Sequence, residues 1–372
     1  MVRICIDARE VRDVETGVGR YAFRLVREIA RLDRHNEYLL LRRAAYPRPI
    51  VVQHNFEDVA VPFGISTGRN LLGGARVVNP LQADIYHCLF HLLPLGVRAG
   101  RIVLTLHDLI WINFPDIAYE ARWRGWLARH FAGPWIGESV RKAHHVIAVS
   151  ETTRQDAIAR YPGSPSKFTV VHHGSDGSGA GNGVACDLPE ICRGRRFIFS
   201  LGNTKPYKNI RRLIEAFGRV AKQCPDLFLL ISGRGDGYAS LAELTRNLGI
   251  TRNVLFTEQL SDAQVRACFE EAVFFAFPSI AEGFGLPVVE AMANGCPVLT
   301  SDASSLSEIA GDAAVLVDPM DVGSIAGGMT RLIRDDGLRE RLMASGRRRA
   351  AGYTWQDCAR KTLAVYEDIV SR

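Results

Sequence analysis

The sequence has no long apolar run. Its 372 residues are 47% hydrophobic and 23% charged, the balance of a soluble globular protein. The longest apolar stretch, at residues 272–278, is strand-sized and far shorter than the roughly 20 residues of a membrane-spanning helix. No secretory leader precedes the strand-like VRICIDA. We therefore expect a cytoplasmic protein that can meet a membrane only peripherally.

Metal-binding and disulfide patterns are also missing. The eight cysteines are scattered, and none forms the C-x-x-C spacing of a zinc or redox site. A chain of 41.1 kDa does not need disulfides to build a core. No D-x-D pair stands at the end of a predicted strand. We expect reduced thiols, no metal ion and no cofactor.

The segment TGVGRYA resembles a dinucleotide-binding turn but lacks its context. Gly17, Gly19 and Ala22 spell G-x-G-x-x-A, yet REVRDVET separates them from the strand that ends near Ala8. No acidic residue ends a second strand about twenty residues later. This argues against an NAD enzyme and favours a flexible loop that presents backbone amides and Arg20 to an anion at a helix start.

Positive charge is concentrated in the first half. Residues 1–180 hold 23 Lys and Arg against 17 Asp and Glu, whereas residues 181–372 hold 23 of each. All ten histidines lie in the first half as well. Phosphates, an anionic membrane or nucleic acid are the partners that such a half can meet, and plain solubility charge is the alternative.

Strand-like and helical segments alternate, which is typical of parallel α/β sheets. A Gly- and Ser-rich stretch interrupts the alternation, so we expect a linker at residues 174–195 between domains at 1–180 and 196–353. Two doubly wound domains facing a cleft are predicted, with ligands at the carboxyl ends of the strands. Expected strands lie near residues 2–8, 84–88, 101–106, 145–149, 168–172, 197–202, 227–232, 254–257, 273–277, 297–300 and 314–317, and expected helices near 18–32, 119–142, 151–161, 209–223, 238–248, 262–271 and 286–294, with three more after 321.

The most informative stretch is EGFGLPVVE. It follows an apolar strand, and Gly283 and Gly285 precede a helix that starts near Leu286. The amides at such a helix start favour a phosphate. Glu282 and Glu290 on either side would repel it, unless each accepts hydrogen bonds from hydroxyl groups. The alternative is two ordinary surface glutamates.

This stretch is similar to the E-x7-E signature of the retaining, GT-B-fold glycosyltransferases of family GT4. The resemblance extends over nearly the whole chain. It includes IDAR…TGVGRYAFRLVREI, LTLHDLIWINFP, VIAVSETTRQDAI, FIFSLGNTKPYKNIRRLIEAF, VLVDPMDVGSIAGGM and YTWQDCARKTLAVYEDI. It implies two Rossmann-like domains, with a C-terminal helix at about 354–372 that packs back onto the first.

The resemblance implies a role for each matched residue. Glu282 would hold hydroxyls of the donor sugar, Glu290 those of the ribose, and Lys208 the diphosphate. His107 would touch the sugar near the attacking hydroxyl, so His107 and Glu282 are the expected catalytic residues. The other expected donor-binding residues are Gly19, Arg20, Asn203, Gly233, Arg234, Leu260, Gly283, Phe284, Gly285 and Leu286.

One departure affects the diphosphate site. Many members of the family carry an arginine five residues before the lysine, and here that position is Asn203. The sequence leaves open whether Lys205, Arg20 or Arg234 supplies a second cation.

An aromatic stripe marks the acceptor side. Residues 119–131 place Tyr119, Trp123, Trp126, Leu127, His130 and Phe131 on one face of a predicted helix. Core packing is one interpretation, and contact with anionic lipid is the other. The glycine-rich stretch 63–80 is expected to be a loop that helps to bind the acceptor.

Together these features predict a hexosyltransferase that uses a nucleotide diphosphate sugar, GDP-mannose first and a UDP-sugar second. The acceptor would be a glycan or a lipid-linked oligosaccharide in cell-surface polysaccharide synthesis. A sugar-nucleotide epimerase of the same fold and a non-catalytic nucleotide- or nucleic-acid-binding protein remain as alternatives, although no nucleic-acid motif is present.

Overall fold

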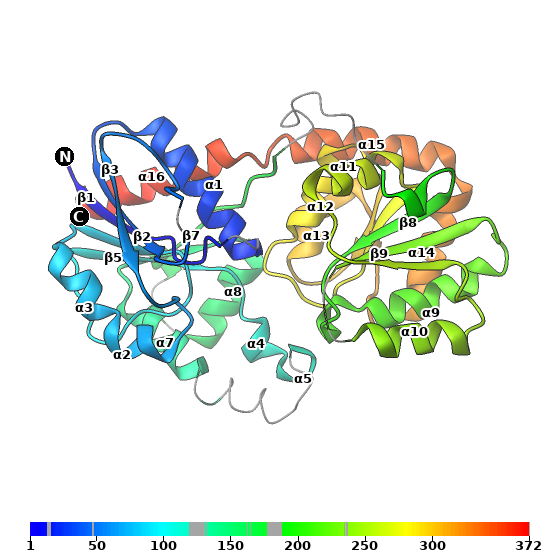
Figure 1. Ribbon diagram of the computed structural model, residues 1–372, viewed down its shortest axis with the longest axis horizontal. Coiled ribbons are helices and arrows are strands. Elements are labelled where there is room, and N and C mark those ends of the chain that lie inside the picture. The colour runs from blue at the N-terminus through cyan, green and yellow to red at the C-terminus, as the bar shows by residue number, and fades with distance from the viewer. Residues whose placement is uncertain are drawn as a thin grey trace. The chain divides into compact units, whose positions relative to one another are not determined.

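The computed structural model describes residues 1–12, 16–46, 48–118, 130, 132–161, 163, 165–176, 188–233, 235 and 237–371. The chain divides into two compact units (Figure 1). The first comprises residues 1–112, 126–174 and 354–372, and the second comprises 113–125 and 175–353.

The first unit is built on a seven-stranded sheet in which every pair is parallel. Its strand order is β3-β2-β1-β4-β5-β6-β7. The order reverses direction between β1 and β4, and a doubly wound sheet binds ligands at such a switch point. The strands are β1 (Arg3–Asp7), β2 (Glu37–Arg43), β3 (Phe56–Val61), β4 (Ile85–Cys88), β5 (Arg101–Leu106), β6 (His145–Ala148) and β7 (Phe168–Val170).

Helices of the first unit pack on this sheet. Thr16 caps α1 because its hydroxyl accepts a hydrogen bond from the Gly19 amide. The last helix of the chain, α16, packs against α1, and the Arg101 guanidinium donates to the Ile369 carbonyl at 3.0 Å. The helices are α1 (Gly17–Leu32), α2 (Gly68–Gly73), α3 (Ala75–Val78), α4 (Ile110–Asn113), α7 (Gly133–Lys142), α8 (Glu151–Arg160) and α16 (Trp355–Ser371).

The second unit has a six-stranded parallel sheet in the order β10-β9-β8-β11-β12-β13. Its switch point lies between β8 and β11. Its strands are β8 (Arg196–Leu201), β9 (Leu227–Ser232), β10 (Val254–Thr257), β11 (Phe274–Phe277), β12 (Val298–Ser301) and β13 (Val315–Val317). Its helices are α5 (Pro115–Ala118), α9 (Ile210–Ala221), α10 (Tyr238–Asn247), α11 (Asp262–Glu271), α12 (Leu286–Ala293), α13 (Ser304–Ala310), α14 (Val322–Arg334) and α15 (Asp336–Ala350).

The two parallel-sheet domains confirm the predicted fold class. The sequence analysis did not predict β2, β3 or α13. The predicted loop at residues 63–80 is wrong, because α2 and α3 form there. Thr67 starts α2 by accepting from the Asn70 amide. Half of the predicted helix at 119–142 and half of the predicted linker at 174–195 lie outside the described residues, which include α7. Among the helices that the structure describes, none is both long and apolar enough to cross a bilayer.

Candidate functional site

Loops at the carboxyl edge of the second sheet carry most of the residues that the sequence singles out. The loop after β8 leads to Lys208, and the loop after β11 contains Glu282 and leads to α12. Because β8 and β11 are the neighbours at the switch point, these two loops flank the place where doubly wound sheets bind ligands.

Lys208 and Glu282 form an ion pair across this switch point. The Nζ atom of Lys208 lies 2.7 Å from Oε1 of Glu282, and the two side chains are only 14% and 13% exposed. The ammonium also lies 4.9 Å from the centre of the Phe277 ring and 5.4 Å from that of Tyr207, which adds cation–π attraction. A cation and a carboxylate are therefore held side by side at the edge of the sheet.

Backbone and amide contacts fix the two loops to each other. The Ile280 amide donates to the Tyr207 carbonyl at 2.7 Å. Asn209 has a φ of +61°, and its side-chain amide donates to the carbonyls of Pro278 at 2.9 Å and Pro319 at 2.7 Å. Asn209 is the residue after Lys208, so this buried amide sets where the lysine leaves the backbone.

Two serines after β12 hold the backbone of Glu282. The Ser304 hydroxyl accepts from the Glu282 amide at 3.0 Å and donates to the Glu282 carbonyl at 2.7 Å. The Ser305 hydroxyl donates to the same carbonyl at 2.9 Å. Ser304 adopts a left-handed φ of +57° to do so, a conformation that costs energy for a residue other than glycine.

We expect Ser304→Gly to reduce the activity of the site without weakening the fold. Glycine accepts the left-handed backbone, but the variant loses both hydrogen bonds to Glu282. Looser placement of a reacting group should cost about tenfold in kcat. The measurement is kcat and ligand affinity, determined separately for each variant. Ser240→Ala on α10 is the control. Equal losses in affinity and kcat would contradict a positioning role.

The turn into α12 requires a glycine. Gly285 caps the helix with a φ of +101°, and a Cβ atom there would lie 2.7 Å from Leu306. Pro287 occupies the first turn, where a missing N–H costs nothing. Phe284 is buried, and its ring packs against Tyr353. The half-buried Glu290 lies in the next turn of α12. The helix start therefore stands beside the Lys208–Glu282 pair.

Glycines also let the loops after β8 and β9 pack backbone against backbone. A Cβ atom at Gly233 would lie 1.8 Å from the Gly202 carbonyl oxygen, and one at Gly235 would lie 2.0 Å from the Thr204 hydroxyl. The Gly233 amide donates to the Thr257 carbonyl at 3.4 Å, so the loop after β10, which leads to the buried Leu260, lies alongside. The side-chain oxygen Oδ1 of Asn203 accepts from the Lys205 backbone amide at 3.1 Å.

The first unit places His107 directly after β5, where it is 6% exposed. Its Nε2 atom lies 3.0 Å from the Leu89 carbonyl, which can only accept, so Nε2 carries the proton. Burial lowers the pKa of His107 to about 4, which keeps the ring neutral. Its ring packs edge-on against Tyr21 of α1. Because its one N–H is directed at Leu89, neutral His107 can only accept a further hydrogen bond, at Nδ1, and it carries no positive charge at neutral pH.

Buried histidines of the first unit should make its stability depend on pH. Burial lowers the pKa of His87 and His91 to about 3 and that of His107 to about 4. An unfolded histidine titrates near 6.5, so the unfolded chain binds more protons in between. The free energy of unfolding is therefore highest above about pH 6.5. As the pH decreases below 6.5, each of these histidines lowers it by about 1.4 kcal/mol per pH unit.

Urea titrations followed by tryptophan fluorescence between pH 7.5 and pH 4 measure this slope. His87→Gln should reduce the slope of the free energy of unfolding against pH by the contribution of one histidine. His54→Gln, which changes an exposed histidine, should leave that slope unchanged. Identical profiles for the wild type and His87→Gln would contradict the assignment.

Gly19 has a structural role at the start of α1. A Cβ atom there would lie 2.5 Å from the Glu10 carbonyl oxygen, and the Gly19 amide is already bonded to Thr16 at 3.1 Å. Arg20 follows it, half-buried, in the first turn. The glycine is thus required for packing, whatever α1 binds.

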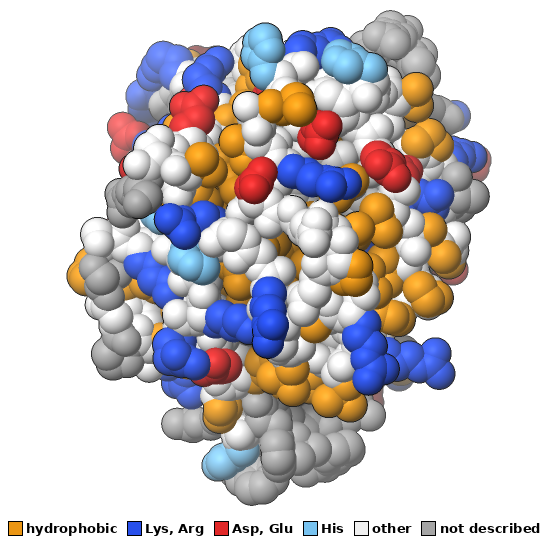
Figure 2. Space-filling model, turned by 90° about the vertical axis from the view of Figure 1, so that its left-hand side faces the viewer, with side chains coloured by type: hydrophobic (Ala, Val, Ile, Leu, Met, Phe, Trp, Pro, Cys, Tyr) orange, Lys and Arg blue, Asp and Glu red, His pale blue; other side chains and the backbone are white. Residues whose placement is uncertain are grey.

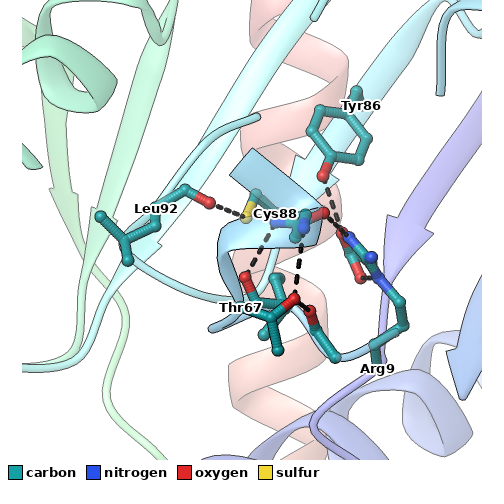
Figure 3. Close-up of polar contacts among 9 residues, drawn as sticks. Arg9, Thr67, Tyr86, Cys88 and Leu92 are labelled. Atoms are coloured by element: carbon teal, nitrogen blue, oxygen red, sulfur yellow. Dashed lines mark hydrogen bonds and ion pairs between the residues drawn. The ribbon is translucent and has the colours of Figure 1, made fainter. Parts of the chain in front are cut away.

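Protein side chains fill the switch point of the first sheet (Figure 3). Arg9 follows β1 and forms a buried ion pair with Asp7. Asp7 also accepts from the Tyr86 hydroxyl of β4 at 2.8 Å, and Arg9 donates to Asn70 at 2.8 Å. Burial and the neighbouring Asp7 raise the pKa of Tyr86 well above its usual value, so the phenol stays a donor. Asp7, Arg9 and Asn70 are each at most 2% exposed, so side chains of the protein occupy this switch point.

The structure thus gathers Lys208, Glu282, residues 283–286 and Glu290 at one edge of the second unit. Asn203, Gly233 and Leu260 lie in neighbouring loops of the same edge, whereas Gly19, Arg20 and His107 belong to the first unit. Arg234 lies outside the described residues, as do Tyr119, Trp123, Trp126, Leu127 and Phe131 of the predicted stripe. Within the part that is described, no group of three or more His, Cys, Asp and Glu side chains could hold a metal ion.

Sequence reasoning missed Asn209, Ser304 and Ser305. Asn209 is the last letter of KPYKN, and a polar residue at the start of a helix was its only signal. The two serines follow β12 in SDASS. A pair of serines after a strand has no motif of its own, and its contacts with Glu282 arise only when β11 and β12 become neighbours.

Comparison with known families agrees with this arrangement. Residues 190–349 match the family model described as "Glycosyl transferases group 1", and residues 16–177 match "Glycosyltransferase Family 4". The first match contains every strand of the second sheet, and the second match contains every strand of the first sheet except β1.

Individual relatives and a solved structure extend the comparison. The chain is 27% identical to the O-antigen chain mannosyltransferase B of Escherichia coli, over 95% of this chain and 96% of the relative. It is 32% identical to the phosphatidyl-myo-inositol mannosyltransferase of Mycobacterium leprae, over 74% and 70%. The sucrose-phosphate synthase structure from Thermosynechococcus elongatus superposes with a TM-score of 0.76 at 18% identity, over 99% of both chains.

Proposed function

Because the chain belongs to glycosyltransferase family 4, we propose that it is a retaining hexosyltransferase whose donor is a nucleotide diphosphate sugar. GDP-mannose is the first candidate donor, since two relatives are named mannosyltransferases. The observation that carries the proposal is the Lys208–Glu282 pair at the switch point of the second sheet. There a cation for the diphosphate and a carboxylate for sugar hydroxyls stand side by side.

The donor diphosphate is proposed to lie between Lys208 and the start of α12. Backbone amides and the dipole at a helix start attract phosphate. As the donor bond breaks, the leaving nucleoside diphosphate gains negative charge, and a fixed cation with oriented amides stabilises that charge. Lys208 and the turn supply this stabilisation without a divalent ion, so we propose a metal-independent enzyme with no cofactor.

Glu282 and Glu290 are assigned to hydroxyl groups. Glu282 accepts from the transferring sugar and Glu290 from the ribose, because a carboxylate is an acceptor for two or more hydroxyls. Donor binding must then draw Lys208 toward the diphosphate and leave Glu282 free for the sugar. The neutral His107 is assigned to a hydroxyl contact near the transferring carbon.

The transfer breaks the bond between the anomeric carbon and the diphosphate oxygen, and the electron pair leaves with the nucleoside diphosphate. The acceptor oxygen bonds to the same face of that carbon, and its proton passes to the departing phosphate oxygen. No carboxylate nucleophile is needed, and Glu282 acts by position and charge. We infer a glycan acceptor, lipid-linked and met peripherally at the inner face of a membrane.

Incubation with GDP-mannose and octyl α-mannoside, followed by NMR, tests the proposal. We expect a new mannoside whose anomeric carbon keeps the α-configuration. A β-linked product would contradict retention. An isomerised nucleotide sugar formed from donor alone would replace the transferase by an epimerase.

A further inference from the structure

The connection between β2 and β3 leaves a hollow beside α1. Parallel neighbours are usually joined through a helix, but the described part of residues 44–55 forms none. Residues 46 and 48–53 instead line, together with α1, a hollow of about 510 Å³. We call it the α1 groove, and it is lined by Phe23, Arg27, Ala30, Arg31, Tyr46, Arg48, Pro49, Ile50, Val51, Val52 and Gln53.

The α1 groove is positively charged. Arg27, Arg31 and Arg48 line it, and the lining residues that the structure describes include no carboxylate. Arg31 pairs with Glu28, but Arg27 and Arg48 form no ion pair with any residue that the structure describes. The Arg27 guanidinium instead lies 5.2 Å from the centre of the Phe23 ring. Two exposed arginines without an ion pair, one of them beside an aromatic ring, favour an anionic occupant.

An apolar residue stands beside these cations. Val52 is 88% exposed, and the exposed Pro49 and half-buried Val51 lie close to it in the chain. A free phosphate would use the arginines but would gain nothing from Val52. A bilayer uses both, because its headgroups carry the charge and its acyl boundary takes the apolar side chain. Figure 2 shows a face of the first unit on which Lys and Arg side chains alternate with hydrophobic ones.

We propose that the α1 groove docks the protein on an anionic bilayer. Lipid phosphates enter the hollow between Arg27 and Arg48, and Val52 inserts at the headgroup level. The inference rests on the proposed function only in what the membrane would deliver, which is the acceptor. Phe23, which lines the groove, lies one helical turn after Gly19 and Arg20 at the start of α1. A membrane held there would bring a lipid-linked acceptor to the end of α1 that precedes the groove.

Flotation with vesicles tests the proposal. Vesicles of equal parts phosphatidylglycerol and phosphatidylcholine should bind the wild type, and pure phosphatidylcholine should not. The double variant Arg27→Gln/Arg48→Gln should partition roughly 30-fold less, at about fivefold per arginine, and Val52→Asn should also weaken binding. The matched control is Arg252→Gln/Arg348→Gln, which removes two exposed charges from the second unit and should bind like the wild type.

Equal binding by the wild type and the groove variant, or equal losses in the groove and control variants, would overturn the proposal. Inorganic phosphate that competes away all vesicle binding at low millimolar concentration would point to a free-anion site and overturn it as well. GDP binding measured on the same samples checks that each variant is folded. It also separates the two inferences, because a wild type that floats but does not bind GDP contradicts the proposed function alone.

Discussion

Glu282→Ala is expected to lower kcat for sugar transfer by on the order of a hundredfold or more. The carboxylate is held in place through its own backbone by Ser304 and Ser305 and stands beside the cation that would bind the diphosphate. Its loss removes the hydroxyl contact that orients the transferring carbon. The same change releases Lys208 from its ion pair, so the affinity for GDP should be preserved or rise.

Initial rates at saturating donor, together with calorimetric titration of GDP, measure the two effects separately. Glu271→Ala, which removes an exposed carboxylate at the end of α11, is the control and should transfer normally. An unchanged kcat in Glu282→Ala would refute its role. A loss of GDP affinity as large as the loss of rate would show that the loop, rather than the hydroxyl contact, had been damaged.

Lys208→Ala is expected to weaken binding of GDP and of GDP-mannose by about 10- to 100-fold, which is the usual strength of a hydrogen bond between charged groups. The lysine lies at the switch point, and Asn203 stands where a second cation would be expected. Binding of the nucleoside without phosphates should not change.

Lys208→Met distinguishes the charge from the packing of the side chain. Methionine keeps an apolar stem against Phe277 and Tyr207 but leaves Glu282 without its partner. Both Lys208 variants should lose affinity for GDP equally, whereas Lys222→Met, an exposed charge after α9, should not. Wild-type dissociation constants in Lys208→Ala and Lys208→Met would exclude the diphosphate contact.

Much of the fold could be predicted because buried parallel strands appear as short apolar runs. The strands at 101–106, 227–232 and 254–257 and the helix at 262–271 have the predicted bounds. β3 was missed because it is an edge strand in which Glu57 and Asp58 interrupt the apolar pattern. β2 has only four apolar residues between charged ends. α13 has neither a capping side chain nor a strong apolar stripe to indicate it.

The candidate site could be predicted only in part. EGFGLPVVE marks a strand–loop–helix junction by its own glycines and proline. The role of Lys208 was predicted only from the family resemblance, because nothing in KPYKN indicates which loop the lysine will contact. Its contact with Glu282 spans 74 positions in the chain, and only the strand order brings the two loops together. The α1 groove was not foreseen either, since it results from a crossover that does not form a helix.

Hydrogen–deuterium exchange in the presence of GDP-mannose tests the central claim most directly. The account predicts that the donor slows exchange in peptides covering residues 202–209 and 280–290 of the second unit, and that Lys208→Ala abolishes this protection. Protection confined to the Asp7–Arg9 region at the switch point of the first sheet, or none with GDP-, UDP-, ADP- or dTDP-sugars, would contradict it.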